Sequence, residues 1–161
     1  MAGPGDPPVG NAGSEETDPE NRQIVHATSL VCFGRGVLIL GDAGCGKSGL
    51  ALQLMAHGAG LIADDRTILS VTDGQLIAAA PPAIKGMIEA RGIGLLNAPD
   101  VGPHPLHLAI DLNRTEVERL PVLRRIRFLG HDLPLLHKVD NGSFPAAILH
   151  YLKAGMRDND S

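Results

Sequence analysis

The chain has 161 residues, the length of one domain, and 43% of them are hydrophobic, enough for a substantial core. Aromatic residues make up only 2%, so the core is built from small aliphatic side chains, which suits a sheet covered by helices. The net charge of −4 comes from residues 1–22, which hold five acidic side chains against one arginine; the neutral remainder offers no general attraction to nucleic acid.

Residues 1–22 are rich in proline, glycine and acidic residues, which predicts a flexible tail. Residues 24–33 are a β-type run, and after a turn at Gly34–Arg35 the apolar run Gly36–Leu40 is typical of a buried strand. We therefore expect the folded domain to cover residues 23–161. The sequence has neither a secretory signal pattern nor an apolar segment long enough for a membrane span, so we expect a cytoplasmic protein.

Residues 41–48 match the phosphate-binding loop pattern G-x(4)-G-K-[ST]. The loop lies between the expected buried strand and an expected helix, which has Leu50, Leu54 and Met55 on one face and Gly58 at its end. The glycines let backbone N–H groups converge on phosphate oxygens, and the helix N-terminus points its positive dipole end at the same anion. The expected nucleotide-binding residues are Gly41, Asp42, Ala43, Gly44, Cys45, Gly46, Lys47 and Ser48.

Within this loop, Lys47 is expected to bridge the outer phosphates of ATP, and Ser48 to ligate Mg²⁺. A short strand, residues 61–63, then ends at Asp64 and Asp65, on the edge where such sheets hold ligands. Adjacent acids suit a division of roles, one near Mg²⁺ and one accepting a hydroxyl proton. The alternative for this pair is a solvated turn.

The second half of the chain is predicted to consist mostly of strands. The predicted elements, in chain order, are a hairpin at residues 66–82 around Asp73–Gly74, a glycine-rich loop returning to a strand at 83–97, a strand near 105–112, a polar turn or short helix at 113–121, strands at 124–130 and 133–139, and a final helix with Ser143 as N-cap and Gly155 as its stop.

Residues with reactive side chains outside the loop carry little signal by themselves. Cys32 and Cys45 lack metal-type spacing and are expected to be reduced thiols. On pattern alone, His26 in its apolar strand is typical of a packed or bystander histidine.

Four segments together resemble the catalytic domain of the bacterial HPr kinase/phosphorylase family. Residues 24–54 resemble the family's histidine strand, second strand and phosphate-binding loop. The segment HGAGLIADDR, residues 57–66, resembles RGHxLVADDR, and IEARGIGLLN, residues 88–97, resembles the signature IEVRGLGIIN. Residues 111–121 resemble a family segment that ends in ERLG. The resemblance covers about residues 24–155, and the second and third segments make it specific.

This resemblance implies an α/β fold, a P-loop kinase domain related to phosphoenolpyruvate carboxykinase, with a central mixed sheet and flanking helices. It implies an ATP- and Mg²⁺-dependent kinase that phosphorylates a serine of the phosphocarrier HPr or of a nitrogen-type HPr homologue. His26 would be a catalytic-site histidine, Asp65 the proton acceptor for the serine hydroxyl with Asp64 beside it, Glu89 a second metal ligand and Arg119 an active-site arginine. Family members assemble as hexamers, so a homo-oligomer is expected, without nucleic-acid or membrane partners.

Three features depart from the family pattern. Only the acidic tail precedes the histidine strand, as in the short, catalytic-domain-only forms of alphaproteobacteria, and Gly49 stands where many members have glutamate. The segment HKVDNGS, residues 137–143, stands where the family has PVRPGRN, which is tied to dephosphorylation, and it holds no arginine. Phosphorylase activity is therefore doubtful. Two alternatives stay open: a nucleotide-binding sensor without phosphotransfer, and a kinase of a different acceptor.

Overall fold

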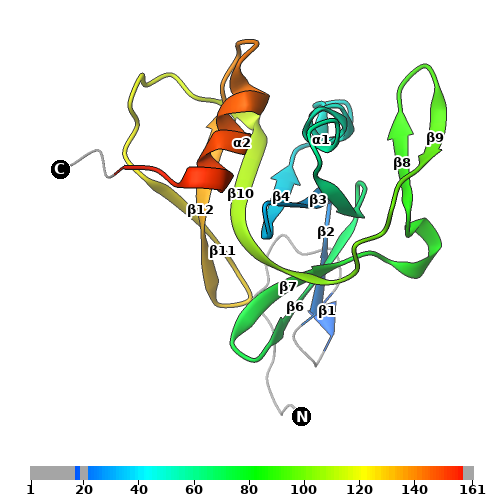
Figure 1. Cartoon of the computed structure of the whole chain (residues 1–161). Helices are drawn as coiled ribbons and strands as arrows, with labels where there is room; N and C mark the ends of the chain where they lie inside the picture. Colours follow the sequence, from blue (N-terminus) through cyan, green and yellow to red (C-terminus); the bar gives the residue numbers. More distant parts are fainter. Residues whose placement is uncertain (1–16, 19–21, 158–161) are drawn as a thin grey trace.

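The computed structural model of the chain describes residues 17–18 and 22–157 (Figure 1). Its strands are β1 (Thr17–Asp18), β2 (Arg22–Val25), β3 (Ala27–Cys32), β4 (Arg35–Leu40), β5 (Gly60–Ala63), β6 (Thr67–Thr72), β7 (Gln75–Ala79), β8 (Met87–Ala90), β9 (Gly94–Asn97), β10 (His104–Thr115), β11 (Arg124–Phe128) and β12 (His131–Lys138). Its helices are α1 (Lys47–Met55), α2 (Phe144–Ala154) and the 3₁₀ helix η1 (Pro82–Ile84).

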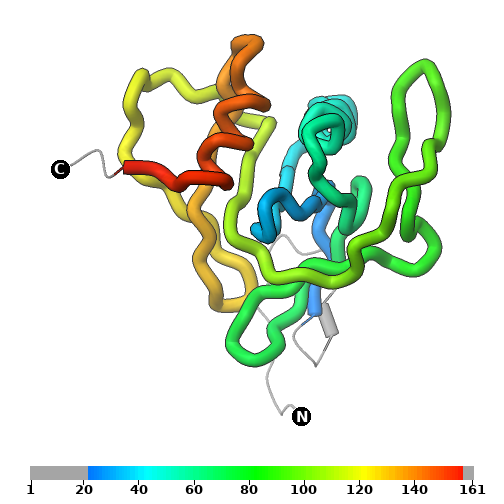
Figure 2. The backbone as a smooth tube through the Cα atoms, viewed as in Figure 1, coloured from blue at the N-terminus to red at the C-terminus, as the bar shows by residue number. Residues whose placement is uncertain are grey.

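Strand β10 is the centre of a mixed sheet with the order β1-β2-β6-β7-β10-β4-β3-β5. The first residues of β10 pair antiparallel with β7, and the following residues pair in parallel with β4 and β12; β11 then pairs with β12. The tube in Figure 2 shows β10 curving from one part of the sheet into the other. Strands β8 and β9 form a separate two-stranded sheet. The expected α/β architecture, a central mixed sheet with flanking helices, is confirmed.

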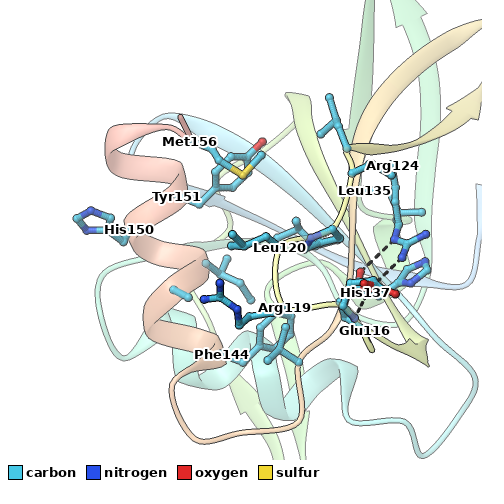
Figure 3. A pocket seen from close by; sticks show the side chains of 18 of the residues that line it. Glu116, Arg119, Leu120, Arg124, Leu135, His137, Phe144, His150, Tyr151 and Met156 are labelled. Carbon is cyan, nitrogen blue, oxygen red and sulfur yellow. Dashed lines mark hydrogen bonds and ion pairs between the residues drawn. The ribbon is translucent and has the colours of Figure 1, made fainter. Parts of the chain in front are cut away.

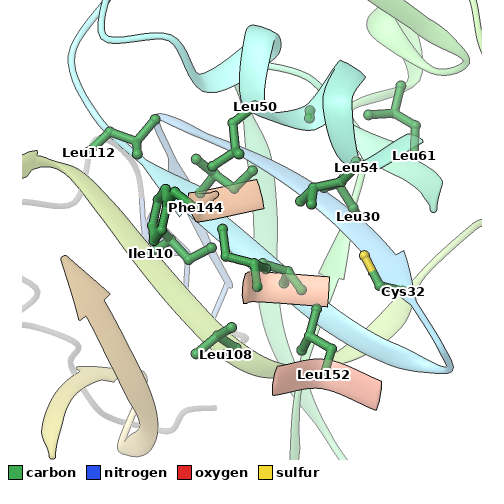
Figure 4. Close-up of a cluster of buried hydrophobic side chains, with 14 of the residues drawn as sticks. Leu30, Cys32, Leu50, Leu54, Leu61, Leu108, Ile110, Leu112, Phe144 and Leu152 are labelled. Atoms are coloured by element: carbon green, nitrogen blue, oxygen red, sulfur yellow. The ribbon is translucent and has the colours of Figure 1, made fainter. Parts of the chain in front are cut away.

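Both faces of the central strands are buried, which explains the continuous apolar run of β4. Val37 and Ile39 face one hydrophobic cluster, and Leu38, between them, faces the other. Helices α1 and α2 cover the first face, as the close-up in Figure 4 shows. The side chains that meet there include Leu50 and Leu54 of α1, Leu108 and Ile110 of β10, and Phe144 and Leu152 of α2. The second face packs against residues of β6 and β7.

Most predicted elements are confirmed. The strand before the phosphate loop, the helix after it, the strands near 105–112, 124–130 and 133–139, and the final helix are all present. Strands β6 and β7 form the predicted hairpin, with Asp73 at φ 53° and Gly74 at φ 75°, the left-handed pair that a two-residue turn of this kind requires. Gly155 ends α2 with a φ of 81°.

Three predictions about elements are corrected. The run 24–33 is two strands, because the chain leaves the β2–β6 pairing before His26 and enters the β3–β4 pairing after it. In residues 83–97 the predicted return to a strand is present as β9, but the loop before it contains a further strand, β8, which pairs with β9 and buries Ile88 against α1. Residues 113–121 contain no helix: β10 extends to Thr115 through its pairing with β12, and the rest is irregular.

Two smaller differences concern the chain ends. Ser143 occupies the N-cap position of α2, but its side chain does not cap the helix; its backbone N and its hydroxyl both donate to Asn141 Oδ1. Strand β1, which lies in the predicted tail, pairs with β2. The other residues of the predicted tail before Arg22 lie outside the described residues.

Candidate functional site

Strand pairing brings three distant segments to one edge of the sheet. Leu40, the last residue of β4, pairs with Ala27, so the phosphate loop begins beside His26. Ala63, the last residue of β5, pairs with Ser29 on the other side of β3, so the two aspartates follow directly beside the same strand. The candidate site is therefore built on β3, between the ends of β4 and β5.

The phosphate loop turns sharply into α1. Gly44 and Gly46 have φ values of 87° and 98°, in the left-handed region that favours glycine, and Gly46 is the N-cap of the helix. The first backbone N–H groups of α1 have no partner within the helix, so they can receive an anion at its N-terminus. This geometry is the one that the loop motif predicts.

Lys47 lies at the mouth of this loop with a side chain only 5% exposed. Its Nζ donates to the backbone oxygen of Gly41 at 2.7 Å and to that of Asp42 at 3.3 Å. The same Nζ lies 3.5 Å from Asp65 Oδ1. The lysine charge is therefore held between the loop backbone and the second aspartate.

Asp64 is buried and ties three elements together through its carboxylate. Its Oδ1 accepts hydrogen bonds from Ser48 Oγ of α1 at 2.7 Å and from Thr28 Oγ1 of β3 at 3.0 Å. Its Oδ2 accepts from the backbone N of Glu89 in β8 at 3.0 Å. Asp64 thus fixes the serine at the start of α1 and the strand that carries the glutamate.

Asp65 points away from this network toward solvent. Its φ of 69° is unusual for a residue other than glycine, and its Oδ1 lies 2.6 Å from Nε2 of His26. The two side chains are 54% and 40% exposed, so the carboxylate is accessible to a second molecule. His26 is therefore not a packed core residue, because it lies in the break between β2 and β3, is partly exposed and contacts the aspartate.

The donor set at this edge fits Mg²⁺. The Ser48 hydroxyl and the Asp64 carboxylate are in contact, and the backbone N of Glu89, whose side chain is exposed, donates to the same carboxylate. Among residues 22–157, no group of three or more His, Cys, Asp or Glu side chains forms a metal cage. Magnesium does not need one, because it commonly binds one or two carboxylates and completes its shell with phosphate oxygens and water. The residues present suit a cation shared with a nucleotide.

Arg119 lies apart from this site. It belongs to the segment between β10 and β11 and lines an apolar groove of about 760 Å³, formed with β12 and α2 (Figure 3). No hydrogen bond or ion pair among the described residues joins Arg119 to His26, Lys47 or either aspartate. The structure thus brings together the other predicted site residues and not this one, and the role of Arg119 stays a prediction.

The same groove contains an ion pair. Arg124 Nε and Nη2 donate to the two carboxylate oxygens of Glu116 at 3.0 and 2.9 Å. These hydrogen bonds lower the pKa of Glu116 to about 2 and raise the pKa of Arg124. The guanidinium of Arg124 is therefore already paired with the carboxylate of Glu116.

The segment 137–143, which departs from the family pattern, lies beside the phosphate loop. A hollow of about 410 Å³ is lined by Cys45 and Gly46 on one side and by Lys138 and Asp140 on the other. Any charge on this segment therefore acts close to the phosphates that the loop would bind.

Two residues that contact the site were not singled out by the sequence. Asn113, at the end of β10, accepts hydrogen bonds at its Oδ1 from the backbone N of Asp42 and from the Cys45 thiol, both at 3.0 Å. Thr28 of β3 contacts both aspartates. For Thr28 the available signal was a polar residue within the β-type run 24–33. For Asn113 the signal was a polar residue at the end of an apolar strand.

The two cysteines are both free, as expected, and differ in their surroundings. Burial raises the pKa of the Cys32 thiol to about 11, so it stays protonated and packs as a core residue.

In the part of the chain that the structure describes, no helix has the length and apolar character of a membrane span.

Comparison with known proteins agrees with this geometry. The family model described as HPr Serine kinase C-terminal domain matches residues 19–102, a range that contains the histidine, the phosphate loop, both aspartates and Glu89. The chain is 38% identical over 87 residues to the HPr kinase/phosphorylase of Clostridium tetani, covering 54% of this chain and 28% of that protein. It is 45% identical over 74 residues to the HPr kinase/phosphorylase of Bordetella petrii, covering 45% of this chain and 24% of that protein.

The solved structure of the HPr(Ser) kinase/phosphatase from Coxiella burnetii has a TM-score of 0.72 and 30% sequence identity, and the match covers 81% of this chain and 88% of that one. The matches to the curated relatives thus span about a quarter of their length, whereas the structural match is nearly complete. The family match covers more than half of the chain and all of the clustered site residues, so the chain belongs to the HPr Serine kinase C-terminal domain family.

Proposed function

We propose that this chain is an ATP- and Mg²⁺-dependent protein kinase domain that phosphorylates a serine of HPr or of an HPr-like phosphocarrier. The observation that carries the proposal is the position of Asp65. Its carboxylate is exposed and lies 2.6 Å from His26 and 3.5 Å from Lys47, which supports a role between a bound phosphate and an incoming hydroxyl.

The side chains support one reaction. The phosphate loop and Lys47 bind the outer phosphates, and the loop's N–H groups favour the charge that develops on them. The acceptor serine oxygen attacks the γ-phosphorus, the bond to the bridging oxygen of ADP breaks, and Asp65 accepts the hydroxyl proton. His26 orients the Asp65 carboxylate through the hydrogen bond between them. Mg²⁺, held by Ser48 and Glu89, would neutralise phosphate charge when bound.

Phosphate transfer to a purified acceptor tests this proposal. The chain is incubated with labelled ATP, Mg²⁺ and HPr-like proteins, and the labelled residue is identified by mass spectrometry. We expect label on one serine, at a rate lower by about 10²-fold or more when Asp65→Asn replaces the wild-type chain. A wild-type chain that binds ATP but labels no phosphocarrier would contradict the proposal and favour a nucleotide-binding sensor. Label on an unrelated hydroxyl compound would favour a different acceptor.

We further propose that the phosphorylase reaction is weak or absent. In that reaction inorganic phosphate attacks the phosphorus of the phosphoserine, the bond to the serine oxygen breaks, and free serine and pyrophosphate form. That reaction brings two anions together, so it requires extra positive charge near the acceptor. The segment beside the phosphate loop offers Lys138, but Asp140 adds a negative charge two residues on. Adding millimolar phosphate to the phosphorylated acceptor should release little pyrophosphate. Release at a rate similar to that of the forward reaction would overturn this part of the proposal.

Assembly as a hexamer stays a prediction from the family resemblance, and a cytoplasmic location stays a prediction from the sequence. Analytical ultracentrifugation of the purified chain measures its oligomeric state. A monomer at micromolar concentration would contradict the hexamer.

A further inference from the structure

Thr28 links the two aspartates through a single hydroxyl group. It lies in β3, is fully buried, and donates a hydrogen bond to Asp64 Oδ1 at 3.0 Å. Its Oγ1 also accepts a hydrogen bond from the backbone N of Asp65 at 3.0 Å. A hydroxyl has one proton and two lone pairs, so both contacts are satisfied at once, with the proton directed to one aspartate and a lone pair to the next.

The two aspartates need this support because they are adjacent in sequence and face different partners. Asp64 is buried and contacts Ser48 and the Glu89 backbone, whereas Asp65 is exposed and contacts His26 and Lys47. The chain achieves this separation with a left-handed backbone at Asp65, at φ 69°. Such a conformation persists in a residue other than glycine when its surroundings hold it. The hydrogen bond from the Asp65 backbone N to Thr28 is such a constraint.

We propose that Thr28 is a positioning residue for phosphate transfer, which holds Asp64 against Ser48 and holds the Asp65 backbone so that its carboxylate meets His26 and Lys47. This inference rests on the proposed kinase function. Thr28 does not face the reacting groups, because it is fully buried and reaches them only through the aspartates. Its loss therefore alters the geometry of the proton acceptor, while the phosphate loop, which Thr28 reaches only through Asp64 and Ser48, keeps its nucleotide.

The test compares three substitutions of Thr28. Thr28→Val keeps the shape of the side chain and removes the hydroxyl. Thr28→Ala also removes the hydroxyl, with a smaller side chain, and replaces the valine variant if that variant does not fold. Thr28→Ser keeps the hydroxyl. We expect Thr28→Val and Thr28→Ala to lower kcat by about tenfold to a hundredfold, the usual effect of small misplacements of a reacting group. The Kd for ATP should change by less than about threefold, since the phosphate loop is intact. Thr28→Ser should restore most of kcat.

Thr67→Val is the matched control. Thr67 is also a fully buried threonine, in β6, but its hydroxyl contacts Ser29 and the backbone oxygen of Ala27 and not the aspartates. We expect it to lower the Tm by about as much as Thr28→Val does and to leave kcat unchanged. A loss of kcat in Thr67→Val equal to that in Thr28→Val would reduce the effect to general destabilisation and overturn the proposal.

A second measurement does not depend on activity. Hydrogen exchange of the Asp65 amide, followed by NMR without acceptor, should become faster in Thr28→Val and stay slow in Thr28→Ser and Thr67→Val. Unchanged exchange in Thr28→Val would overturn the positioning role even if the chain proves to have no kinase activity. Wild-type kcat in Thr28→Val, with Asp65→Asn inactive, would overturn it and leave the proposed function standing.

Discussion

Replacing Asp65 by asparagine separates catalysis from nucleotide binding. The amide has the shape of the carboxylate and can still contact His26, and the backbone hydrogen bond to Thr28 is unaffected. What is lost is the negative charge and the ability to take a proton. If Asp65 is the proton acceptor, kcat should fall by about 10²-fold or more, which corresponds to about 2.7 kcal/mol of transition-state stabilisation.

The effect of Asp65→Asn on ATP binding should be small, and it should strengthen binding rather than weaken it. Asp65 Oδ1 lies 3.5 Å from Lys47 Nζ, and its side chain is 54% exposed, so solvent screens the pair strongly. At this distance Coulomb's law in a water-like dielectric gives about 1 kcal/mol. Without the aspartate, Lys47 interacts only with the loop carbonyls and the phosphates, and one negative charge near the phosphates is gone. ATP should therefore bind equally well or up to about fivefold more tightly.

The assay measures the ATP Kd by calorimetry and kcat by transfer of label to the acceptor. Asp73→Asn serves as the control, since Asp73 also has a left-handed backbone, at φ 53°, but lies in the β6–β7 turn. It should change neither quantity. An Asp65→Asn chain whose kcat stays within about tenfold of wild type would refute the role as proton acceptor. Weaker ATP binding that accounts for the whole loss of activity would show that Asp65 serves binding instead.

Three further substitutions test the rest of the site. Lys47→Ala should abolish phosphate transfer and weaken ATP binding while the circular dichroism melting curve keeps a cooperative transition; transfer at the wild-type rate would contradict the assignment of the loop. Glu89→Gln should raise the Mg²⁺ concentration needed for half-maximal activity, because a charged ligand is lost, and an unchanged Mg²⁺ titration would exclude it as a ligand. Asn113→Ala removes the acceptor that holds the Asp42 backbone N; the KM for ATP should rise about fivefold, equivalent to about 1 kcal/mol for one hydrogen bond, with kcat unchanged.

Local sequence patterns determined the elements around the phosphate loop. The apolar run of β4 and the glycines at positive φ act within a few residues of one another, and so does the Asp73–Gly74 turn. Such features depend on backbone conformation and on the spacing of apolar residues, both of which are visible in a short window. The family resemblance added His26 and Glu89 as candidates beside the aspartate pair. The pairing of β3 with β4 and β5 brought His26 and Asp65 to the loop, and the hydrogen bond from the Glu89 backbone N to Asp64 joins β8 to the same site.

Tertiary structure alone decided how these residues are connected. The β-type run 24–33 contains no glycine or proline to mark a break, yet it breaks at His26 because its two halves pair with different strands. Asn113 and Asp42 are 71 residues apart, and Thr28 and Asp64 are 36 apart, so their hydrogen bonds depend on strand order and register. Local propensity contains no information about either. For the same reason the sequence could not separate Arg119 from the site, since its distance from the aspartates is set by the path of the chain after β10.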